Sequence, residues 1–403
     1  MSTRPFRLST RSLRWGAPIV AGIAVAAAAI IPSAAASSQH PALPARDAGQ
    51  LLADLATVHA PNLSGTIVET ARLGLPDLSS LPGADAALSW QSLITGSHTI
   101  HIWLSGQDRQ RVALLGDLAE TDVIHNGTDL WTYASQSNSV THVKLPADAA
   151  KNDLTPASAL PVSPQQAAQE ALQAINPTTK VSVDLTAEVA GRPAYQIELR
   201  PRDSRSLIAS VRIALDSQTK IPLRVQVFAT GQSLPAFETA FTEVSYAKPA
   251  ASIFAFVPPA GATVNEHNVA NRTTRKVFAS ASAKATRPTE HVMVQPGSKS
   301  GARTHFVSGV TVIGSGWTAV AVANAQSVAD LLGGAAAGGP GGGGPGGAGQ
   351  ISSLLMQIAT PVAGGHVVRT ALFTVLFAND GRVLIGPVGT AAIQQVAATG
   401  RAL

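Results

Sequence analysis

The chain has 403 residues, of which 45% are hydrophobic and 13% charged, and it contains no cysteine. The absence of cysteine excludes disulfide bonds, a thiol nucleophile, iron–sulfur clusters and cysteine zinc sites. The formal net charge is +5, but residues 37–266 have a net charge of −6, whereas residues 267–303 have a net charge of +6. Because the body of the chain is acidic, the charge pattern argues against a protein that binds nucleic acid.

Residues 1–36 have the layout of a secretory signal peptide. Four arginines precede an apolar run from Gly16 to Ile31, and Ala34 to Ala36 supply a cleavage pattern. The apolar run of about 16 residues is shorter than the roughly 20 that a membrane span needs. We therefore expect an exported protein that lies in the extracytoplasmic envelope or is secreted. The alternative is that an uncleaved N-terminal anchor holds it at the membrane.

The domain that we expect over residues 45–265 contains two helices, over 47–59 and 164–175, because apolar residues recur there at helical spacing. Elsewhere apolar residues recur at every second position, which is typical of an antiparallel sheet with one face buried and the other in solvent. Asn126-Gly127 is a turn signal between two strands. We expect strands over 65–72, 98–104, 109–115, 122–133, 181–187, 194–200, 208–216, 223–229 and 236–245.

Residues 73–96 interrupt this strand pattern with eight large apolar side chains and two prolines. The segment is too apolar for an exposed loop and too broken for a strand. One interpretation is a helical insertion that covers the core. The other is a mobile lid over an apolar cavity, in which case Leu88, Trp90 and Leu93 gate the entrance.

Residues 266–303 lack hydrophobic periodicity and are rich in serine, threonine, proline and basic residues, so we expect a flexible linker there. Near a membrane its cations would be attracted to anionic lipid, at about 1 kcal/mol each; the alternative is a solvated spacer. Residues 304–403 are expected to form a small C-terminal α+β unit. It contains strands over 307–322, a Gly-rich loop at 333–349, a helix over 351–358, a hairpin of 366–377 and 382–388, and a final helix over 390–398.

Motifs that carry catalysis are absent from the sequence, which has no nucleophile elbow, phosphate-binding loop or metalloprotease signature. His98 and His101 are three residues apart on an expected strand, which places them on opposite faces and argues against a shared metal site. Asp117, Glu120, Asp122 and Asp129 lie near strand ends, but nothing singles out an acid–base pair among them. We therefore assign no catalytic residue, metal ligand or cofactor, and an envelope enzyme without a recognisable motif stays the second alternative.

The apolar face of the expected sheet has two explanations. It is either a core that the sheet shares with its helices, or the wall of a groove that holds an acyl chain. Each buried methylene contributes about 0.8 kcal/mol, so such a groove needs no charged site. If it is a groove, we expect it to be lined by Ile100, Ile102, Val211, Ile213, Leu215, Leu223, Val225 and Val227.

Three segments resemble LolA-like lipoprotein carriers. The first is 123–133, the second is 189–199, and the third combines Leu215-Asp216 with 221–224, 241–244 and 254–259. Together they cover most of residues 45–265. The resemblance implies an α+β fold in which helices cover a half-open antiparallel β-barrel. It also implies an apolar cavity for the acyl chains of lipids or lipoproteins, and no catalytic residues.

The plan of a large carrier-like domain, a linker and a small tail is similar to that of RseB/MucB regulators of sigma-E. Trp317 and the hairpin at Asp380-Gly381 add to this similarity. The resemblance implies a first alternative function, an envelope-stress regulator that binds a membrane-bound anti-sigma factor. The insertion, the basic linker and the glycine run depart from that family and look actinobacterial. Our leading expectation is an exported, non-enzymatic protein that binds acyl chains.

Overall fold

The computed structural model describes residues 43–58, 60–75, 93–116, 119–145, 163–173, 175, 177–183, 186–268, 306–307, 310–324 and 357–403. The expected signal peptide, the Gly-rich loop at 333–349, and most of the insertion and of the linker lie outside these residues. So do the lid residues Leu88 and Trp90. These expectations, and the domain boundaries drawn with them, stay predictions. None of the described helices is long and apolar enough to cross a membrane.

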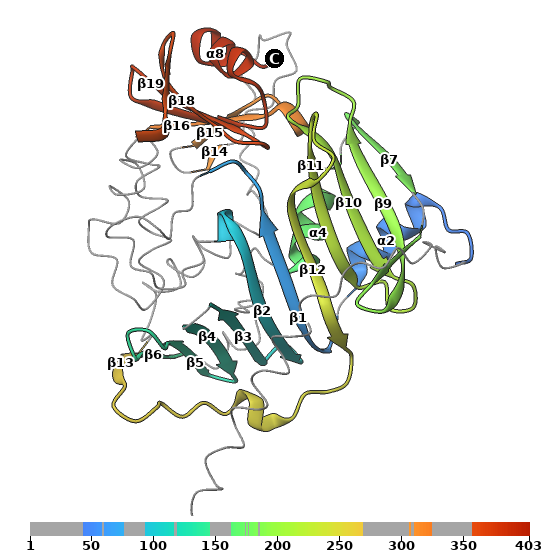
Figure 1. Cartoon of the computed structure of the whole chain (residues 1–403), viewed down its shortest axis with the longest axis vertical. Coiled ribbons are helices and arrows are strands. Elements are labelled where there is room, and N and C mark those ends of the chain that lie inside the picture. The colour runs from blue at the N-terminus through green and yellow to red at the C-terminus, as the bar shows by residue number, and fades with distance from the viewer. Residues whose placement is uncertain are drawn as a thin grey trace, which may run out of the picture. The chain divides into compact units, whose positions relative to one another are not determined.

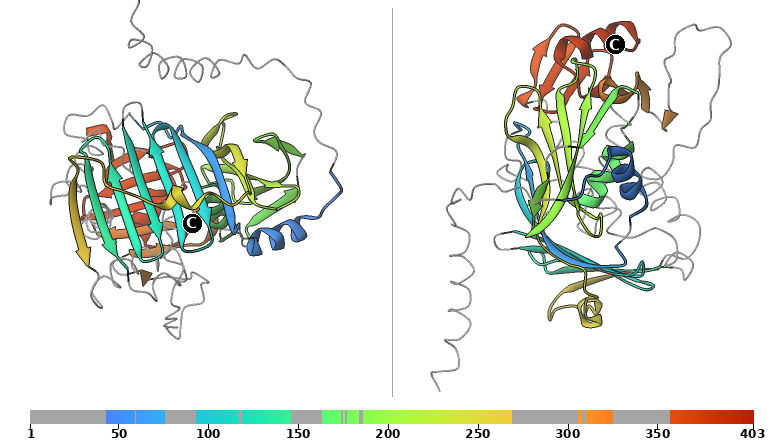
Figure 2. Two further views of the ribbon diagram at one scale, coloured as in Figure 1. Left: turned by 90° about the horizontal axis from the view of Figure 1, so that it is seen from below. Right: turned by 90° about the vertical axis from the view of Figure 1, so that its right-hand side faces the viewer.

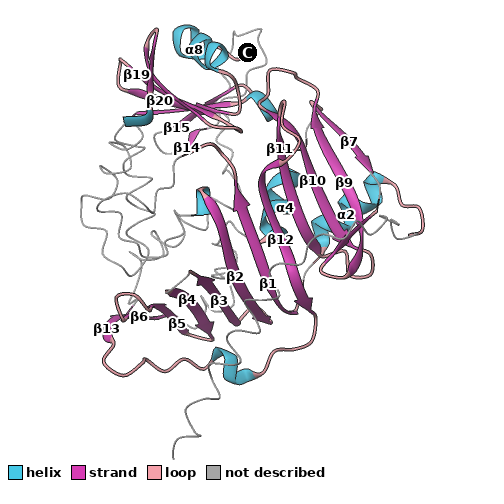
Figure 3. Ribbon diagram, viewed as in Figure 1, coloured by secondary structure: helices cyan, strands magenta, loops and turns pink. Residues whose placement is uncertain are grey.

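The described residues form two β-sheets with few helices (Figure 3), which confirms the expected β-rich architecture. The first sheet contains β1 (Asn62–Ala71), β2 (Gly96–Ser105), β3 (Arg109–Leu115), β4 (Glu120–Asn126), β5 (Asp129–Ala134), β6 (Ser139–Lys144), β7 (Thr179–Val183), β8 (Ala187–Val189), β9 (Arg192–Pro201), β10 (Ile208–Asp216), β11 (Pro222–Ala229), β12 (Pro235–Ser245) and β13 (Thr263–Asn268). The second contains β14 (Phe306–Val307), β15 (Val310–Ile313), β16 (Val320–Asn324), β17 (Thr360–Val362), β18 (Gly365–Arg369), β19 (Thr374–Ala378) and β20 (Arg382–Gly386).

The first sheet is open and is not closed into a barrel, which corrects the expectation of a half-open barrel. Its strand order is β13-β6-β5-β4-β3-β2-β1-β12-β11-β10-β9-β7, with β8 paired to β9 (Figure 1). The pairs are antiparallel except for β13, which runs parallel to β6 at the sheet's edge. Residues 266–268, which the sequence pattern assigned to the start of the linker, are therefore the end of an edge strand.

The sheet bends sharply, and α2 (Ala48–Thr57) and α4 (Pro164–Gln173) lie on the inside of the bend (Figure 2). A register shift between Thr66 and Ile67 marks a bulge in β1, and bulges increase local twist. Gly65 is required beside it, because a Cβ atom there would lie 2.4 Å from the carbonyl oxygen of Glu243. We call the side that carries α2 and α4 the inner face, and the opposite side the outer face.

The connection between β12 and β13 crosses the outer face of the sheet (Figure 2). It contains the short 3-10 helix η5 (Ala251–Phe254), which contacts β3 and β4. Phe254 is only 1% exposed and fixes this connection to the sheet. The outer face is therefore partly covered, and the connection carries the chain to the far edge where β13 pairs.

The second sheet has a core of its own, formed with α8 (Thr390–Thr399) around Leu376, Leu384 and Ile393. It also contacts the first sheet. The backbone amide of Leu207 donates to the carbonyl oxygen of Pro387 at 2.7 Å. Trp317, on the 3-10 helix η6 (Gly316–Thr318), lies in the buried cluster beneath α2. The C-terminal segment therefore builds a separate sheet and also contributes to the core of the first.

Candidate functional site

The inner face of the first sheet is largely apolar, as the strand register shows. Ile213 lies opposite Val225 on the neighbouring strand, and Val225 lies opposite Thr239. On the other side of β12, Phe241 lies opposite Ile67, which in turn lies opposite Ile100. Residues from β2 to β10 therefore share one face, as the alternating pattern predicts.

The residues predicted to line a groove are core residues in this structure. Seven of the eight are at most 5% exposed, and Val227 is half-buried. Val211, Ile213, Leu215 and Val225 pack in one cluster with Leu51 and Leu55 of α2 and Ala168 of α4. Ile100, Ile102 and Leu223 belong to a second cluster, which also contains the predicted lid residue Leu93. The helices thus cover the part of the expected ligand surface that the first cluster forms.

Glu69 interrupts the apolar inner face. It lies on β1 in phase with Ile67 and Ala71, opposite His98 on β2 and Thr239 on β12. Its side chain is completely buried, and among the described residues neither carboxylate oxygen has a hydrogen-bond partner. Burial raises the pKa of Glu69 to about 8, because an ionised carboxylate is costly to remove from water.

Other buried carboxylates show how unusual Glu69 is. Among the described residues, three further carboxylates are less than 9% exposed, and each has an arginine partner. These pairs are Asp122 with Arg111 at 2.7 Å, Glu198 with Arg200 and Arg212 at 2.7 and 3.1 Å, and Asp216 with Arg192. Burial raises the pKa of Glu198 and of Asp216, but hydrogen bonds from their arginines outweigh it and hold both below the usual value. Glu69 has no arginine partner among the described residues, so it differs from the other three buried carboxylates.

Glu69 is not among the site residues predicted from the sequence, although the sequence contains a signal for it. A charged residue falls at an inward position of β1, between Ile67 and Ala71. Alternation identifies that position as inward, but alternation does not show whether a partner reaches it from another strand. Only the register with β2 and β12 shows that the facing residues are a histidine and a threonine.

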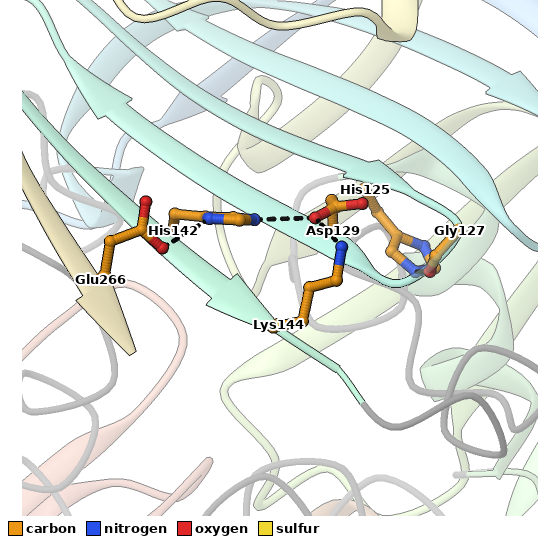
Figure 4. A network of polar contacts seen from close by, with 6 residues as sticks. All are labelled: His125, Gly127, Asp129, His142, Lys144 and Glu266. Atoms are coloured by element: carbon orange, nitrogen blue, oxygen red, sulfur yellow. Dashed lines mark hydrogen bonds and ion pairs between the residues drawn. The ribbon is translucent and has the colours of Figure 1, made fainter. Parts of the chain in front are cut away.

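A second polar group lies at the edge formed by β5, β6 and β13 (Figure 4). His142 contacts Glu266 through Nδ1 at 2.7 Å and Asp129 through Nε2 at 2.8 Å. Lys144 donates to the same oxygen of Asp129 at 2.8 Å. Burial raises the pKa of Asp129, but the hydrogen bonds from Lys144 and His142 lower it more, to below its usual value.

This network is built for holding β13 in place. Both ring nitrogens of His142 contact a carboxylate, so neither nitrogen is free to exchange a proton with a substrate. The ring also stacks on Trp131, with centroids 3.7 Å apart. His142 therefore links the edge strand β13 to β5, and the arrangement is a tether.

Replacing His142 by alanine is expected to loosen β13. Glu266 is 62% exposed, so we expect a cost of only about 1–2 kcal/mol, at the lower end for charged hydrogen bonds. Backbone amides of residues 263–268 should then exchange with deuterium roughly ten times faster. The matched control is His101→Ala, which removes an outer-face histidine without a carboxylate bridge among its described contacts. Equal exchange in the two variants would show that His142 does not hold the strand.

The two histidines that the sequence offers as candidates for a metal site lie on opposite faces of β2. His98 lies on the inner face opposite Glu69, and its Nε2 is 2.7 Å from the carbonyl oxygen of Thr95. His101 lies on the outer face, edge-on to Trp103. The two do not form a pair, as their spacing predicts. No group of side chains in the described ranges could hold a metal ion.

Residues 83–265, less than half of the chain, match a family model described as "Predicted periplasmic protein (DUF2092)". No curated protein matches the chain. Solved structures that match include the MucA/MucB complex of Pseudomonas aeruginosa, with 17% identity over 87% of this chain and 95% of that chain, and a TM-score of 0.37. A LolA-superfamily protein of Nitrosomonas europaea matches with 10% identity over 53% of this chain and 99% of that chain, and a TM-score of 0.22.

A putative outer membrane lipoprotein-sorting protein domain from Vibrio parahaemolyticus also matches, with 10% identity over 51% of this chain and 94% of that chain, and a TM-score of 0.19. The matches thus include proteins of both groups that the sequence resembles. At this level of similarity, nothing about ligand or partner follows from them.

Proposed function

We propose that this chain is an extracytoplasmic, non-enzymatic binding protein that holds acyl chains of lipids or lipoproteins against the inner face of the first sheet. The observation that supports the proposal is the largely apolar inner face, which runs from β2 to β10 and is covered in part by two short helices. The leader-like residues 1–36 support a location outside the cytoplasm.

An acyl chain can compete with the helices that cover this face. Each of the two helices has ten residues, a length that is marginal without tertiary contacts. The side chains by which α2 is buried are Leu51 and Leu55, each contributing about 1.5–3 kcal/mol. A chain of about a dozen methylenes contributes on the order of 10 kcal/mol. Displacement of α2 by an acyl chain is therefore energetically feasible, and in this proposal α2 acts as a movable cover.

Replacing Val227 by glutamate tests the proposal on the inner face. Val227 is half-buried against the cluster beneath α2, so a charge can be placed there without entering the centre of the core. We expect the Kd for fluorescent parinaric acid to rise at least about tenfold, because a carboxylate next to the acyl chain must be desolvated. Val257→Glu is the control, because Val257 is 80% exposed. If the folded V227E variant bound as tightly as V257E, the inner face would not be the binding surface.

The alternative is a regulator that binds a membrane-bound anti-sigma factor. The feature that favours it is the second sheet, which has its own core in addition to its contacts with the first. Purification of the protein from its own host separates the two functions. Lipid in the purified sample supports the carrier, whereas a stoichiometric membrane protein supports the regulator.

A further inference from the structure

Glu69 lies where the apolar clusters of the inner face meet. Its strand neighbour Ile67 belongs to the cluster that includes Ile100 and Phe241. Two residues further along β1, Ala71 belongs to a cluster that includes Ala229. Across β12, Val225 belongs to the cluster beneath α2. Glu69 is therefore flanked, along β1 and across β12, by residues of three apolar clusters.

An isolated carboxyl group at such a place is costly to keep. A buried polar group without a hydrogen bond loses its interactions with water and gains none in return. The other buried carboxylates of the described chain avoid this loss through arginines. A buried group without a hydrogen-bond partner in the described part of the fold is therefore a candidate for contact with a ligand.

We propose that Glu69 is the polar anchor of the inner face, where its neutral carboxyl group donates a hydrogen bond to the carbonyl oxygen of an acyl ester or amide. This inference rests on the proposed function. It adds the part of the ligand that is recognised, and it makes binding depend on the protonation of one residue.

The chemistry of the carboxyl group selects this ligand class. A protonated carboxyl group has one O–H donor, which matches a carbonyl acceptor that carries no charge. Because burial raises the pKa of Glu69 to about 8, the group is mainly protonated at neutral pH. Above that pH it loses the donor and places a negative charge among apolar side chains, so the ester should be released.

The charged groups around Glu69 leave it the principal titrating group of this surface. On β2 the facing titratable residue is His98, and on β12 the facing residue is Thr239. On β12, Glu238 alternates with Thr239 and lies on the outer face, where it accepts from Gln226 at 3.0 Å. Glu243 lies beyond the register shift, opposite Thr66 on β1. Arg224 on β11 also lies on the outer face, where it donates to Gln196 at 3.2 Å. His98 is therefore the group that needs its own control.

Two fluorescent probes separate the anchor from the apolar surface. The methyl ester of parinaric acid has a carbonyl group and no ionisable group, whereas diphenylhexatriene is apolar and has no carbonyl. For the wild type we expect the Kd of the ester to rise about tenfold between about pH 6 and pH 10, the factor that one hydrogen bond supplies. The Kd of diphenylhexatriene should stay constant over the same range.

Three variants complete the test. Glu69→Gln keeps a donor at every pH, so ester binding should lose its pH dependence. Glu69→Leu should weaken ester binding about tenfold at low pH and leave diphenylhexatriene unaffected. His98→Asn should keep the wild-type pH profile.

The outcomes distinguish the anchor from the proposed function. Suppose that diphenylhexatriene binds but Glu69→Leu binds the ester as tightly as the wild type. Then Glu69 is not the polar anchor, whereas the proposal that the inner face binds acyl chains is retained. A pH profile that disappears in His98→Asn would also overturn the anchor. If neither probe binds to the folded wild type, the proposed function is wrong and the anchor falls with it.

Discussion

Replacing Trp317 by alanine is expected to lower the free energy of unfolding by about 3–5 kcal/mol, the range for truncating a buried aromatic side chain. Trp317 is 6% exposed and packs in the cluster that contains Leu51 of α2 and Val211 of β10. Its indole Nε1 donates to the hydroxyl oxygen of Thr179 at 2.8 Å. The substitution therefore leaves a cavity beneath α2 and removes a buried hydrogen bond in one step.

Urea unfolding of two further variants separates these contributions. Trp317→Phe keeps an aromatic ring and loses the N–H donor, so we expect a loss of only about 1–2 kcal/mol. Trp103→Ala is the matched control, because Trp103 is a half-buried tryptophan on the outer face, edge-on to His101. A W317A midpoint equal to that of W103A would contradict a role for Trp317 in the core.

Which residues are destabilised in W317A is as informative as the size of the loss of stability. Trp317 comes from the C-terminal segment, but its neighbours belong to the first sheet and its helices. Deuterium exchange in W317A should therefore increase in residues 48–57 as well as in residues 310–324. An increase confined to the C-terminal segment would indicate that the two sheets unfold independently. The result also decides whether a deletion of residues 304–403 can leave the inner face intact.

Local patterns were sufficient to predict most strands and both early helices. The helix expected over 47–59 is observed at Ala48–Thr57, where the side chain of Asp47 accepts from the amide of Gln50 at 2.8 Å. The turn at Asn126-Gly127 separates β4 from β5, and Gly127 has a φ of +62°. These features depend on residues that are close in sequence, so periodicity and turn chemistry reveal them.

Features that depend on distant partners could not be predicted. β13 pairs with β6, whose residues lie more than 100 positions earlier, and nothing in 263–268 marks a parallel partner. Alternation predicts that Ile213 and Val225 point inward. It does not predict that α2 packs on them, because that depends on where the helix docks. The isolation of Glu69 depends on which residues face it from β2 and β12. Sequence therefore gives the face of a residue, and only the fold gives its neighbours.

The second large expected effect is a fall in the free energy of unfolding of the wild type as the pH rises. The Glu69→Gln variant should not show this fall. The pKa of Glu69 is raised from 4.5 to about 8 in the folded protein, so the folded state binds the proton more tightly than the unfolded chain. Between these two values the unfolded state binds fewer protons, and the free energy of unfolding falls as the pH rises. At about 1.4 kcal/mol per pKa unit, the loss is roughly 3–5 kcal/mol by pH 8.

Urea unfolding of the wild type and of Glu69→Gln at intervals from about pH 5 to pH 9 measures this loss directly. The difference between the two proteins cancels groups that titrate alike in both, such as His125, whose pKa burial lowers. Glu198 and Asp216 have lowered pKa values, so their contributions disappear only under more acidic conditions and do not overlap with this range. The amide variant should become the more stable protein as the pH rises through this range. Parallel curves would mean that Glu69 has a partner or water in solution. If the two curves instead converge and cross, the folded protein keeps an unpaired acid on its apolar inner face.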